Sequence, residues 1–182
     1  MRRGKYINTF SGGQFWPLSP EKDEIKAIDI AHGLSMLCRA NGHYRHFYSV
    51  AQHSIHCAEE AKVRGLSHRI QLACLLHDAS EAYIGDLTRP LKSLLDKYLE
   101  IETQLQQQIY EAFGLDHLSD EELYWVQEID DAMLNYEMSL LLDNHGLNDK
   151  VLLGNYDLSF KLMAEVRQIF KDRLDQLICK VE

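Results

Sequence analysis

Apolar residues recur at every third or fourth position along most of this chain, which is the spacing that gathers them on one face of an α-helix. Runs in which polar and apolar residues alternate, as in half-buried strands, are few between the turn signals. The pattern therefore predicts an all-α protein. We expect six helices, over about residues 24–40, 49–63, 67–83, 90–113, 119–142 and 158–180.

Residues that start and end helices support these limits. An Asn-Gly pair at 41–42 is typical of the end of a helix. Ser67 is placed to cap the third helix, and Ser119 with Glu122 has the spacing of a capping box at the start of the fifth. Pro90 suits the first turn of the fourth helix, because an N–H there has no helical partner and the φ of proline is already helical.

Length and composition suit one domain. A chain of 182 residues with 46% hydrophobic content can bury a substantial core, and no repeat, low-complexity tract or long linker divides it. We expect a single domain over residues 1–182. Its motif-bearing core should cover about 28–137, with the helix at 158–180 packed against it.

The charge and hydropathy of the chain exclude several classes of partner. A formal net charge of −9 argues against nucleic acid and against an anionic membrane, because the summed field repels phosphates, although a small anionic substrate remains possible. No apolar stretch approaches the roughly 20 residues of a membrane span, and the N-terminal segment lacks the apolar region of a signal peptide. We expect a soluble, cytoplasmic protein.

The cysteines agree with a reducing compartment. None has CxxC spacing, and all lie in stretches with apolar periodicity, which predicts reduced core residues rather than disulfides or a zinc knuckle. They are Cys38, Cys57, Cys74 and Cys179.

A histidine and several acidic residues interrupt the apolar segment LACLLHDASEAYIGDLTRP at 72–90. His77 and Glu81 are four residues apart and Asp78 and Glu81 are three apart, so in a helix these side chains can share one pocket. The flanking LACLL has to pack inward, where a carboxylate without a compensating charge is costly. A divalent metal ion would compensate, and an imidazole paired with a carboxylate suits a first-row transition ion better than calcium.

Further ligands have to come from other helices. His53 lies in the apolar stretch YSVAQHSIHCAEE and Asp130 in WVQEIDDAMLNYE, and neither has an evident local partner. With His77 and Asp78 they form a set of two histidines and two carboxylates, which leaves positions for water and substrate on a six-coordinate ion. Asp131 is the rival of Asp130, because one of two adjacent aspartates can simply face solvent.

These residues resemble the ordered signature H, HD, D of the HD-domain metal-dependent phosphohydrolases, an all-helical family. The segment HDASEAYIGDLTRPLK is similar to the stretch of the bacterial 5′-deoxynucleotidase branch in which HDASE is followed by GDL and Pro-x-Lys. SVAQHS resembles the first-histidine motif and QEIDDAML the final aspartate motif, and DIAHGLSMLCRANGHYRHFYSVAQHS is similar to small bacterial and phage HD hydrolases. The resemblance covers about residues 28–137 and implies a helical HD-domain bundle with the metal site between its central helices.

The resemblance also implies roles for individual residues. Glu81 would orient a water held by the ion, which is the nucleophile, or take its proton. Asp86 would orient the sugar or protonate the leaving oxygen. One divalent ion is expected, and Co, Mn, Zn, Fe or Ni suits the donors better than Mg. The metal ligands would be His53, His77, Asp78 and Asp130.

Arg39 corresponds to an arginine that precedes the first histidine in the nucleotidase branch, and its planar guanidinium suits a phosphate. In that branch a tryptophan implicated in sugar selection follows the arginine, whereas Ala40 follows here. The preference for deoxyribose over ribose is therefore in doubt. The resemblance and the length of the amphipathic helices also favour a homodimer.

The function predicted from these observations is a 5′-nucleotidase that converts a nucleoside monophosphate to nucleoside and phosphate. One alternative is an HD hydrolase that acts on a cyclic or polyphosphorylated nucleotide, and another is a regulatory nucleotide-binding protein without turnover. Glu81 could also be an ordinary surface glutamate, and Asp86 could cap the turn before Pro90.

Other polar and aromatic residues have two open interpretations each. Four histidines could support the site or serve packing and solvation, and the GHYRH segment at 42–46 could attract phosphate or be a solvated loop. Three aromatic residues could stack a base or fill the core. The histidines are His32, His43, His46 and His56, and the aromatic residues are Phe15, Trp16 and Tyr83.

Overall fold

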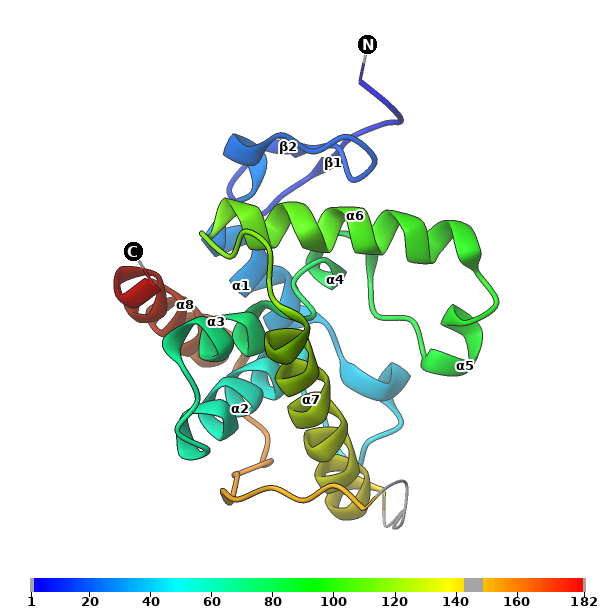
Figure 1. Ribbon diagram of the computed structural model, residues 1–182. Helices are drawn as coiled ribbons and strands as arrows, with labels where there is room; N and C mark the ends of the chain where they lie inside the picture. The colour runs from blue at the N-terminus through cyan, green and yellow to red at the C-terminus, as the bar shows by residue number, and fades with distance from the viewer. Residues whose placement is uncertain (1, 143–148, 182) are drawn as a thin grey trace.

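A computed structural model describes residues 2–142 and 149–181 (Figure 1), and it confirms the predicted all-α class. Apart from one small hairpin, its regular elements are helices. In chain order they are β1 (Ile7–Asn8), β2 (Gln14–Phe15), the 3₁₀ turn η1 (Lys22–Glu24), α1 (Ala27–Met36), the 3₁₀ turn η2 (Arg39–Gly42), α2 (Val50–Val63), α3 (His68–Leu76), α4 (Glu81–Ile84), α5 (Arg89–Lys92), α6 (Asp96–Ala112), α7 (Asp120–Leu141) and α8 (Met163–Val181).

The core is centred on α2 and α3. α2 packs against α1, α3, α7 and α8, while α6 lies across one end of the bundle, next to the hairpin (Figure 1). Ile30, Leu72, Ile129 and Phe170 are fully buried contributions from four different helices. Burying each such side chain stabilises the fold by about 1.5–3 kcal/mol. Polar groups on the inner faces of α2 and α3 are therefore held rigidly and away from bulk water.

Two predicted helices have the expected starts. Ser49 caps α2, and its side chain accepts a hydrogen bond from the Gln52 backbone N–H at 3.2 Å. The Gln52 side-chain oxygen in turn accepts the Ser49 backbone N–H at 3.4 Å. Ser119 and Glu122 form the predicted capping box of α7. Since these boxes fix where each helix begins, they also fix which side chains face the core farther along.

The first predicted helix is shorter than expected. It was expected over residues 24–40, but α1 ends at Met36, and the chain then turns through η2. Ala40 and Asn41 have φ of 51° and 50°, the left-handed region, so the right-handed helix cannot continue through them. The prediction erred because apolar periodicity runs through residues 37 and 38 although the backbone there is extended.

The third predicted helix is interrupted at the His-Asp dipeptide. It was expected to run through Tyr83, but α3 ends at Leu76 and α4 begins at Glu81. The side chain of Gln106 on α6 donates Nε2–H to the Leu76 carbonyl at 2.7 Å and accepts the Ser80 N–H at 3.1 Å. In a continuous helix these two backbone groups would bond to each other. The inserted amide therefore interrupts the helix and leaves residues 77–80 as a tight turn.

The remaining differences lie at element ends. The fourth predicted helix is divided into α5 and α6, because residues 93–95 form turn hydrogen bonds instead of continuing the helix. The last helix begins at Met163 rather than near 158, and the hairpin pairs Ile7 with Phe15 where no strand was expected. Residues 143–148 of the predicted connection between the last two helices lie outside the described residues.

The segment before α8 is fastened to α2 by one buried carboxylate. Glu60 accepts hydrogen bonds from the backbone N–H groups of Leu153 and Gly154 at 2.9 and 3.0 Å and from the Tyr156 hydroxyl at 2.7 Å. Arg64 adds a charged donor at 2.7 Å. These bonds take the place that secondary structure would otherwise fill in this segment.

All four cysteines are free, but they do not share one environment. Cys57 and Cys74 are buried, as expected, and Cys38 is half-buried. Cys179 is exposed, so its prediction as a core residue is wrong, because it lies on the outer face of α8. Within the described part of the chain, no helix combines the length and hydropathy needed to cross a membrane.

Candidate metal centre

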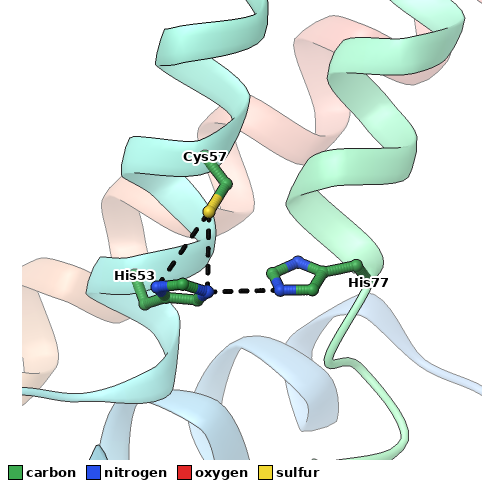
Figure 2. Close-up of side chains that lie close together, drawn as sticks. All are labelled: His53, Cys57 and His77. Atoms are coloured by element: carbon green, nitrogen blue, oxygen red, sulfur yellow. Dashed lines mark hydrogen bonds between the residues drawn. The ribbon is translucent and has the colours of Figure 1, made fainter. Parts of the chain in front are cut away.

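Four predicted ligands converge between α2, α3 and α7. His53 Nε2 lies 3.2 Å from His77 Nε2, 3.1 Å from Asp130 Oδ1 and 3.9 Å from Asp78 Oδ2. His77 Nε2 lies 3.3 Å from Asp78 Oδ2 and 3.7 Å from Asp130 Oδ1. Figure 2 shows the two imidazole rings directed at each other, one from near the start of α2 and one from the end of α3. The break after α3 brings two adjacent residues, His77 and Asp78, to the same point.

The outer nitrogens of both rings are fixed by acceptors. His53 Nδ1 is 2.7 Å from Glu137 Oε1, and His77 Nδ1 is 2.8 Å from the Cys74 carbonyl oxygen. Burial acts to raise the pKa of Glu137, but His53 and Arg39 outweigh it and hold that pKa below its ordinary value. Both acceptors therefore require an N–H, which leaves the two Nε2 atoms facing each other.

With both Nδ1 atoms protonated, two neutral rings would face each other with Nε2 lone pairs 3.2 Å apart. This is unfavourable unless a proton or a metal ion lies between them. A shared cation satisfies both nitrogens and the adjacent oxygens of Asp78 and Asp130 at once. The arrangement therefore fits a metal ion on its own chemistry.

The charges of the site attract such a cation. Burial acts to lower the pKa of His77, but Asp78 and Asp130 outweigh it and raise that pKa well above its ordinary value. Burial acts to raise the pKa of Asp130, but hydrogen bonds with His53 and His77 hold that pKa well below its ordinary value. Asp78 likewise has a lowered pKa, because His77 outweighs its burial. The same field that retains protons would retain a metal ion.

The spacing of the donor atoms agrees with this interpretation. Two ligands bound at about 2.0–2.2 Å to one ion, roughly at right angles, lie about 3 Å apart. The measured donor separations run from 3.1 to 3.9 Å. Only small side-chain movements would close them onto one ion.

Cys57 adds a sulfur donor near the histidines. The nitrogens of His53 and His77 and the sulfur of Cys57 all lie within 4.8 Å of one another (Figure 2). Its Sγ is 3.5 Å from His53 Nε2 and 4.0 Å from Nδ1 of the same ring, so it sits beside the ring face rather than in line with one nitrogen. Burial raises the pKa of this thiol well above its ordinary value, whereas the carboxylates are already ionised. The two carboxylates are therefore the more readily available anionic donors.

Glu81 is the first residue of α4, directly after the His-Asp turn. It is buried, and its Oε2 has no hydrogen-bond partner among residues 2–142 and 149–181. Burial and the charges of Asp78 and Asp86 raise the pKa of Glu81 well above its ordinary value. A buried polar atom without a partner calls for a ligand or water, so the interpretation of Glu81 as an ordinary surface residue is wrong.

Asp86 lies on the turn between α4 and α5. Burial is the main cause that raises its pKa, and Asp78 adds to it. The Tyr98 hydroxyl donates to the carbonyl of neighbouring Gly85 at 2.7 Å and holds this turn against α6. Thr88, the residue that caps α5, makes no side-chain cap bond, and among the described residues none comes from the Asp86 carboxylate. The capping alternative for Asp86 therefore has no contact to support it.

Arg39 lies next to the site and contacts two of its carboxylates. Its Nε donates to Glu137 Oε2 at 3.1 Å and its Nη1 lies 3.3 Å from Asp78 Oδ2, with only 11% of its side chain exposed. These contacts favour a role in holding Asp78 and Glu137 over the predicted contact with a phosphate. Charged groups in such a buried series of ion pairs depend on one another, because each charge offsets the cost of removing its neighbour from water.

Glu137 is the site residue that sequence reasoning missed. It is fully buried and receives hydrogen bonds from His53, Arg39 and the Tyr44 hydroxyl, the last at 3.4 Å. Its signal was available, because it follows Asp130 by seven residues, or two helical turns. A charged residue on the same helix face as a candidate ligand indicates a second polar layer behind that ligand.

Asp131, the rival of Asp130, faces away from the histidines. Arg89 donates Nη2 to Asp130 Oδ2 at 2.8 Å and Nη1 to Asp131 Oδ1 at 2.9 Å. Lys150 also contacts Asp131 at 3.0 Å. Only Asp130 brings an oxygen to the histidine pair, so the register favours Asp130.

The remaining histidines and aromatic residues have structural contacts. His56 is 2.9 Å from the Tyr48 hydroxyl and its pKa is lowered to about 4, chiefly by burial. His46 Nε2 is 2.8 Å from the Leu158 carbonyl, His32 stacks on Phe10 at 3.9 Å, and His43 is exposed. Phe15 and Tyr83 stack on each other in the core, and Trp16 packs under Arg2, so the core interpretation applies to Phe15 and Tyr83.

Residues 39–140, more than half of the chain, match the HD domain family. The chain is 42% identical over 110 residues to the uncharacterized protein YfdR of Escherichia coli (strain K12), a match that covers 60% of this chain and 59% of that protein. It is 40% identical over 111 residues to the uncharacterized protein RCAP_rcc00048 of Rhodobacter capsulatus, which covers 58% of this chain and 56% of that protein. The chain thus spans less than two thirds of the length of either relative.

The fold and the site together define an HD domain, a class composed generally of metal-dependent hydrolases. The chain belongs to the HD domain family.

Proposed function

We propose that this protein is a metal-dependent phosphohydrolase that hydrolyses nucleoside 5′-monophosphates to nucleoside and phosphate. One observation carries the proposal. Two imidazole nitrogens and two ionised carboxylates meet at one point. Beside them, at the start of α4, lies a buried carboxyl oxygen of Glu81 that has no hydrogen-bond partner in the described part of the chain. This combination provides a cation site and a proton-handling group together.

His53, His77, Asp78 and Asp130 are the proposed holders of one divalent ion. When bound, such an ion supplies a Lewis acid that lowers the pKa of water and offsets negative charge on phosphoryl oxygens. The Nδ1 bonds to Glu137 and the Cys74 carbonyl keep the two rings turned toward that position. The mixed nitrogen and oxygen donors favour Co, Mn, Zn, Fe or Ni over Mg.

Glu81 is proposed to handle the proton of the attacking water. Burial and the charges of Asp78 and Asp86 raise the pKa of Glu81, which makes its carboxylate a stronger proton acceptor than an ordinary glutamate, as general base catalysis requires. Asp86, whose pKa is also raised, is proposed to orient the sugar or to protonate the leaving oxygen. Both groups lie in the turns after the His-Asp pair, so the chain delivers metal ligands and proton carriers from one segment.

The choice of 5′-monophosphates rests on the likeness of HDASEAYIGDLTRPLK to the nucleotidase branch. Ala40 stands where that branch has tryptophan, and it is held in a left-handed conformation with φ of 51°. A methyl group cannot pack against a sugar as an indole does, so we propose that ribose and deoxyribose nucleotides are both accepted. Three expectations about partners stay predictions: a small nucleotide as the substrate, no nucleic-acid or membrane partner, and a homodimer.

The first experiment measures phosphate release from ribo- and deoxyribonucleoside 5′-monophosphates. Chelator-stripped protein is reloaded separately with Co, Mn, Zn, Fe, Ni or Mg, and elemental analysis verifies loading. His77→Ala, prepared in parallel, controls for a contaminating phosphatase. We expect turnover with at least one transition ion and none with His77→Ala.

Two other results would redirect the proposal. Hydrolysis of cyclic or polyphosphorylated nucleotides alone would keep the phosphohydrolase class and replace the substrate. Silence across the whole panel with the ion bound would contradict the proposal and favour a regulatory nucleotide-binding role.

A further inference from the structure

Arg89 occupies a distinctive place at the edge of the candidate metal centre. It lies at the start of α5, and its guanidinium donates to Asp130 Oδ2 at 2.8 Å and to Asp131 Oδ1 at 2.9 Å. The other oxygen of Asp130 faces His53 at 3.1 Å. Arg89 is therefore separated from the donor cluster by the width of one carboxylate.

We propose that Arg89 is the residue that binds the phosphate of the substrate, and that it rests on Asp130 and Asp131 until a substrate arrives. This inference depends on the proposed function, which supplies the phosphate. It differs from the sequence-based expectation, which placed that task on Arg39.

Exposure distinguishes the two arginines. The Arg89 side chain is 58% exposed, whereas the Arg39 side chain is 11% exposed and contacts Asp78 and Glu137. Moving Arg39 onto a substrate would leave the fully buried Glu137 without its charged partner, which is strongly unfavourable. Moving Arg89 would leave Asp130 to the cation site and Asp131 to Lys150, which contacts it at 3.0 Å. Of these two arginines, Arg89 is the one that can exchange a carboxylate partner for a phosphate at low cost.

The charge of the surroundings gives this exchange its direction. Asp78, Asp86 and Asp130 crowd the site, and the chain carries a formal net charge of −9, so a doubly charged phosphate meets repulsion as it approaches. An arginine offers two parallel N–H donors that fit two oxygens of a phosphate as well as they fit two carboxylate oxygens. The fork of Arg89 already spans one oxygen from each of two aspartates, so it is set for a bidentate anion.

The test compares Arg89→Ala and Arg89→Lys with Lys150→Ala as the matched control. Lys150 contacts Asp131 at 3.0 Å and Glu128 at 2.8 Å, so its loss removes a neighbouring positive charge and leaves the guanidinium of Arg89 in place. Binding of inorganic phosphate to manganese-loaded protein is measured by calorimetry, and manganese affinity is measured separately. KM and kcat are determined for the nucleotide that wild-type protein hydrolyses.

For Arg89→Ala we expect phosphate binding to weaken and KM to rise by about tenfold or more, with manganese affinity and kcat within about threefold of wild type. Arg89→Lys should fall between Arg89→Ala and wild type, because it keeps the charge and loses the fork. Lys150→Ala should change phosphate binding and KM much less than Arg89→Ala, because it keeps the proposed donor and removes only the second partner of Asp131. A role confined to holding Asp130 would instead weaken manganese binding and leave phosphate binding unchanged, which would overturn the inference.

The failure of this inference and the failure of the proposed function give different results. Nucleotide hydrolysis with unchanged KM and phosphate binding in Arg89→Ala would reject the role of Arg89 and leave the function standing. Phosphate binding that depends on Arg89 without any hydrolysis would support the role of Arg89 and reject the hydrolase. A wild-type protein that binds manganese but neither binds phosphate nor hydrolyses nucleotides would reject both.

Discussion

His53 is oriented by the residue behind it as much as by those beside it. Glu137 Oε1 accepts a hydrogen bond from the Nδ1–H of His53 at 2.7 Å, and Arg39 Nε donates to Glu137 Oε2 at 3.1 Å. These two bonds keep the ring from rotating away from His77. Such a supporting layer fixes both the tautomer and the direction of a ligand. Metal affinity should therefore depend on residues that never touch the ion.

At this scale, His77 and Glu81 should separate binding from turnover. We expect His77→Ala to lose both metal and activity, because one of four donors is removed. Glu81→Gln keeps the shape of the side chain and loses the proton carrier, so it should keep the metal and lose about 10²–10⁴-fold in kcat. Elemental analysis and phosphate release on the same samples provide the comparison. A metal-loaded, active His77→Ala would overturn the ligand assignment.

The adjacent aspartates give a second test. Asp130→Asn should impair metal loading much more than Asp131→Asn, because only Asp130 places an oxygen 3.1 Å from His53. Titration of each stripped variant with cobalt, followed by its visible absorption, measures the two affinities. The reverse order would move the last ligand by one residue.

At the scale of elements, local sequence signals explained the starts of helices and failed where a distant side chain intervened. The capping boxes at Ser49 and Ser119 depend on residues three apart, so sequence spacing was sufficient to predict the start at Ser119. The break after Leu76 depends on Gln106, thirty positions away, and no periodicity in LACLLHDASEAY reveals it. The candidate ligands could be singled out because polar residues in apolar stretches stand out, whereas Arg89 lies in a polar turn where nothing distinguishes it.

Gln106 should accordingly act on the centre without touching it. Gln106→Leu leaves the Ser80 N–H without its partner, which destabilises the fold by about 1–3 kcal/mol. It also removes one of two hydrogen bonds to the Leu76 carbonyl, which still accepts the Ala79 N–H at 2.9 Å. We expect lower metal affinity and a lower midpoint in urea. Gln107→Leu is the control, because Gln107 lies on the exposed face of the same helix, where its side chain donates to Glu111 at 2.9 Å. Wild-type metal affinity in Gln106→Leu would show that the turn keeps its shape unaided.

At the scale of the whole molecule, the link from Glu60 to the segment before α8 predicts a pH dependence. Burial acts to raise the pKa of Glu60, but hydrogen bonds from Leu153, Tyr156, Gly154 and Arg64 outweigh it and hold the pKa below its ordinary 4.5. A lowered folded-state pKa contributes stability that is fully present above the unfolded value, here near 4.5, and is lost as pH falls through the folded value.

Unfolding in urea at pH 7 and at pH values below 4.5 measures this contribution. Glu60→Gln should lower stability at pH 7 by about 1.5–3 kcal/mol, the range for a hydrogen bond to a charged group, and should flatten the loss of stability toward acid pH. Glu59→Gln is the control. Glu59 is the neighbour of Glu60 on α2, and its half-buried carboxylate pairs with Arg173 on α8, so its loss should change the stability at pH 7 little. An acid limb as steep in Glu60→Gln as in wild type would refute the assignment.

The insertion of Gln106 into the backbone between Leu76 and Ser80 also sets an order of events during synthesis. Residues 68–84 are translated before the amide that interrupts them. A nascent chain that ends before α6 carries the His-Asp dipeptide within a stretch free to form one continuous helix, with its two side chains on different faces. The four candidate ligands can therefore come together only late, when α6 has docked and α7 brings Asp130 beside the histidines.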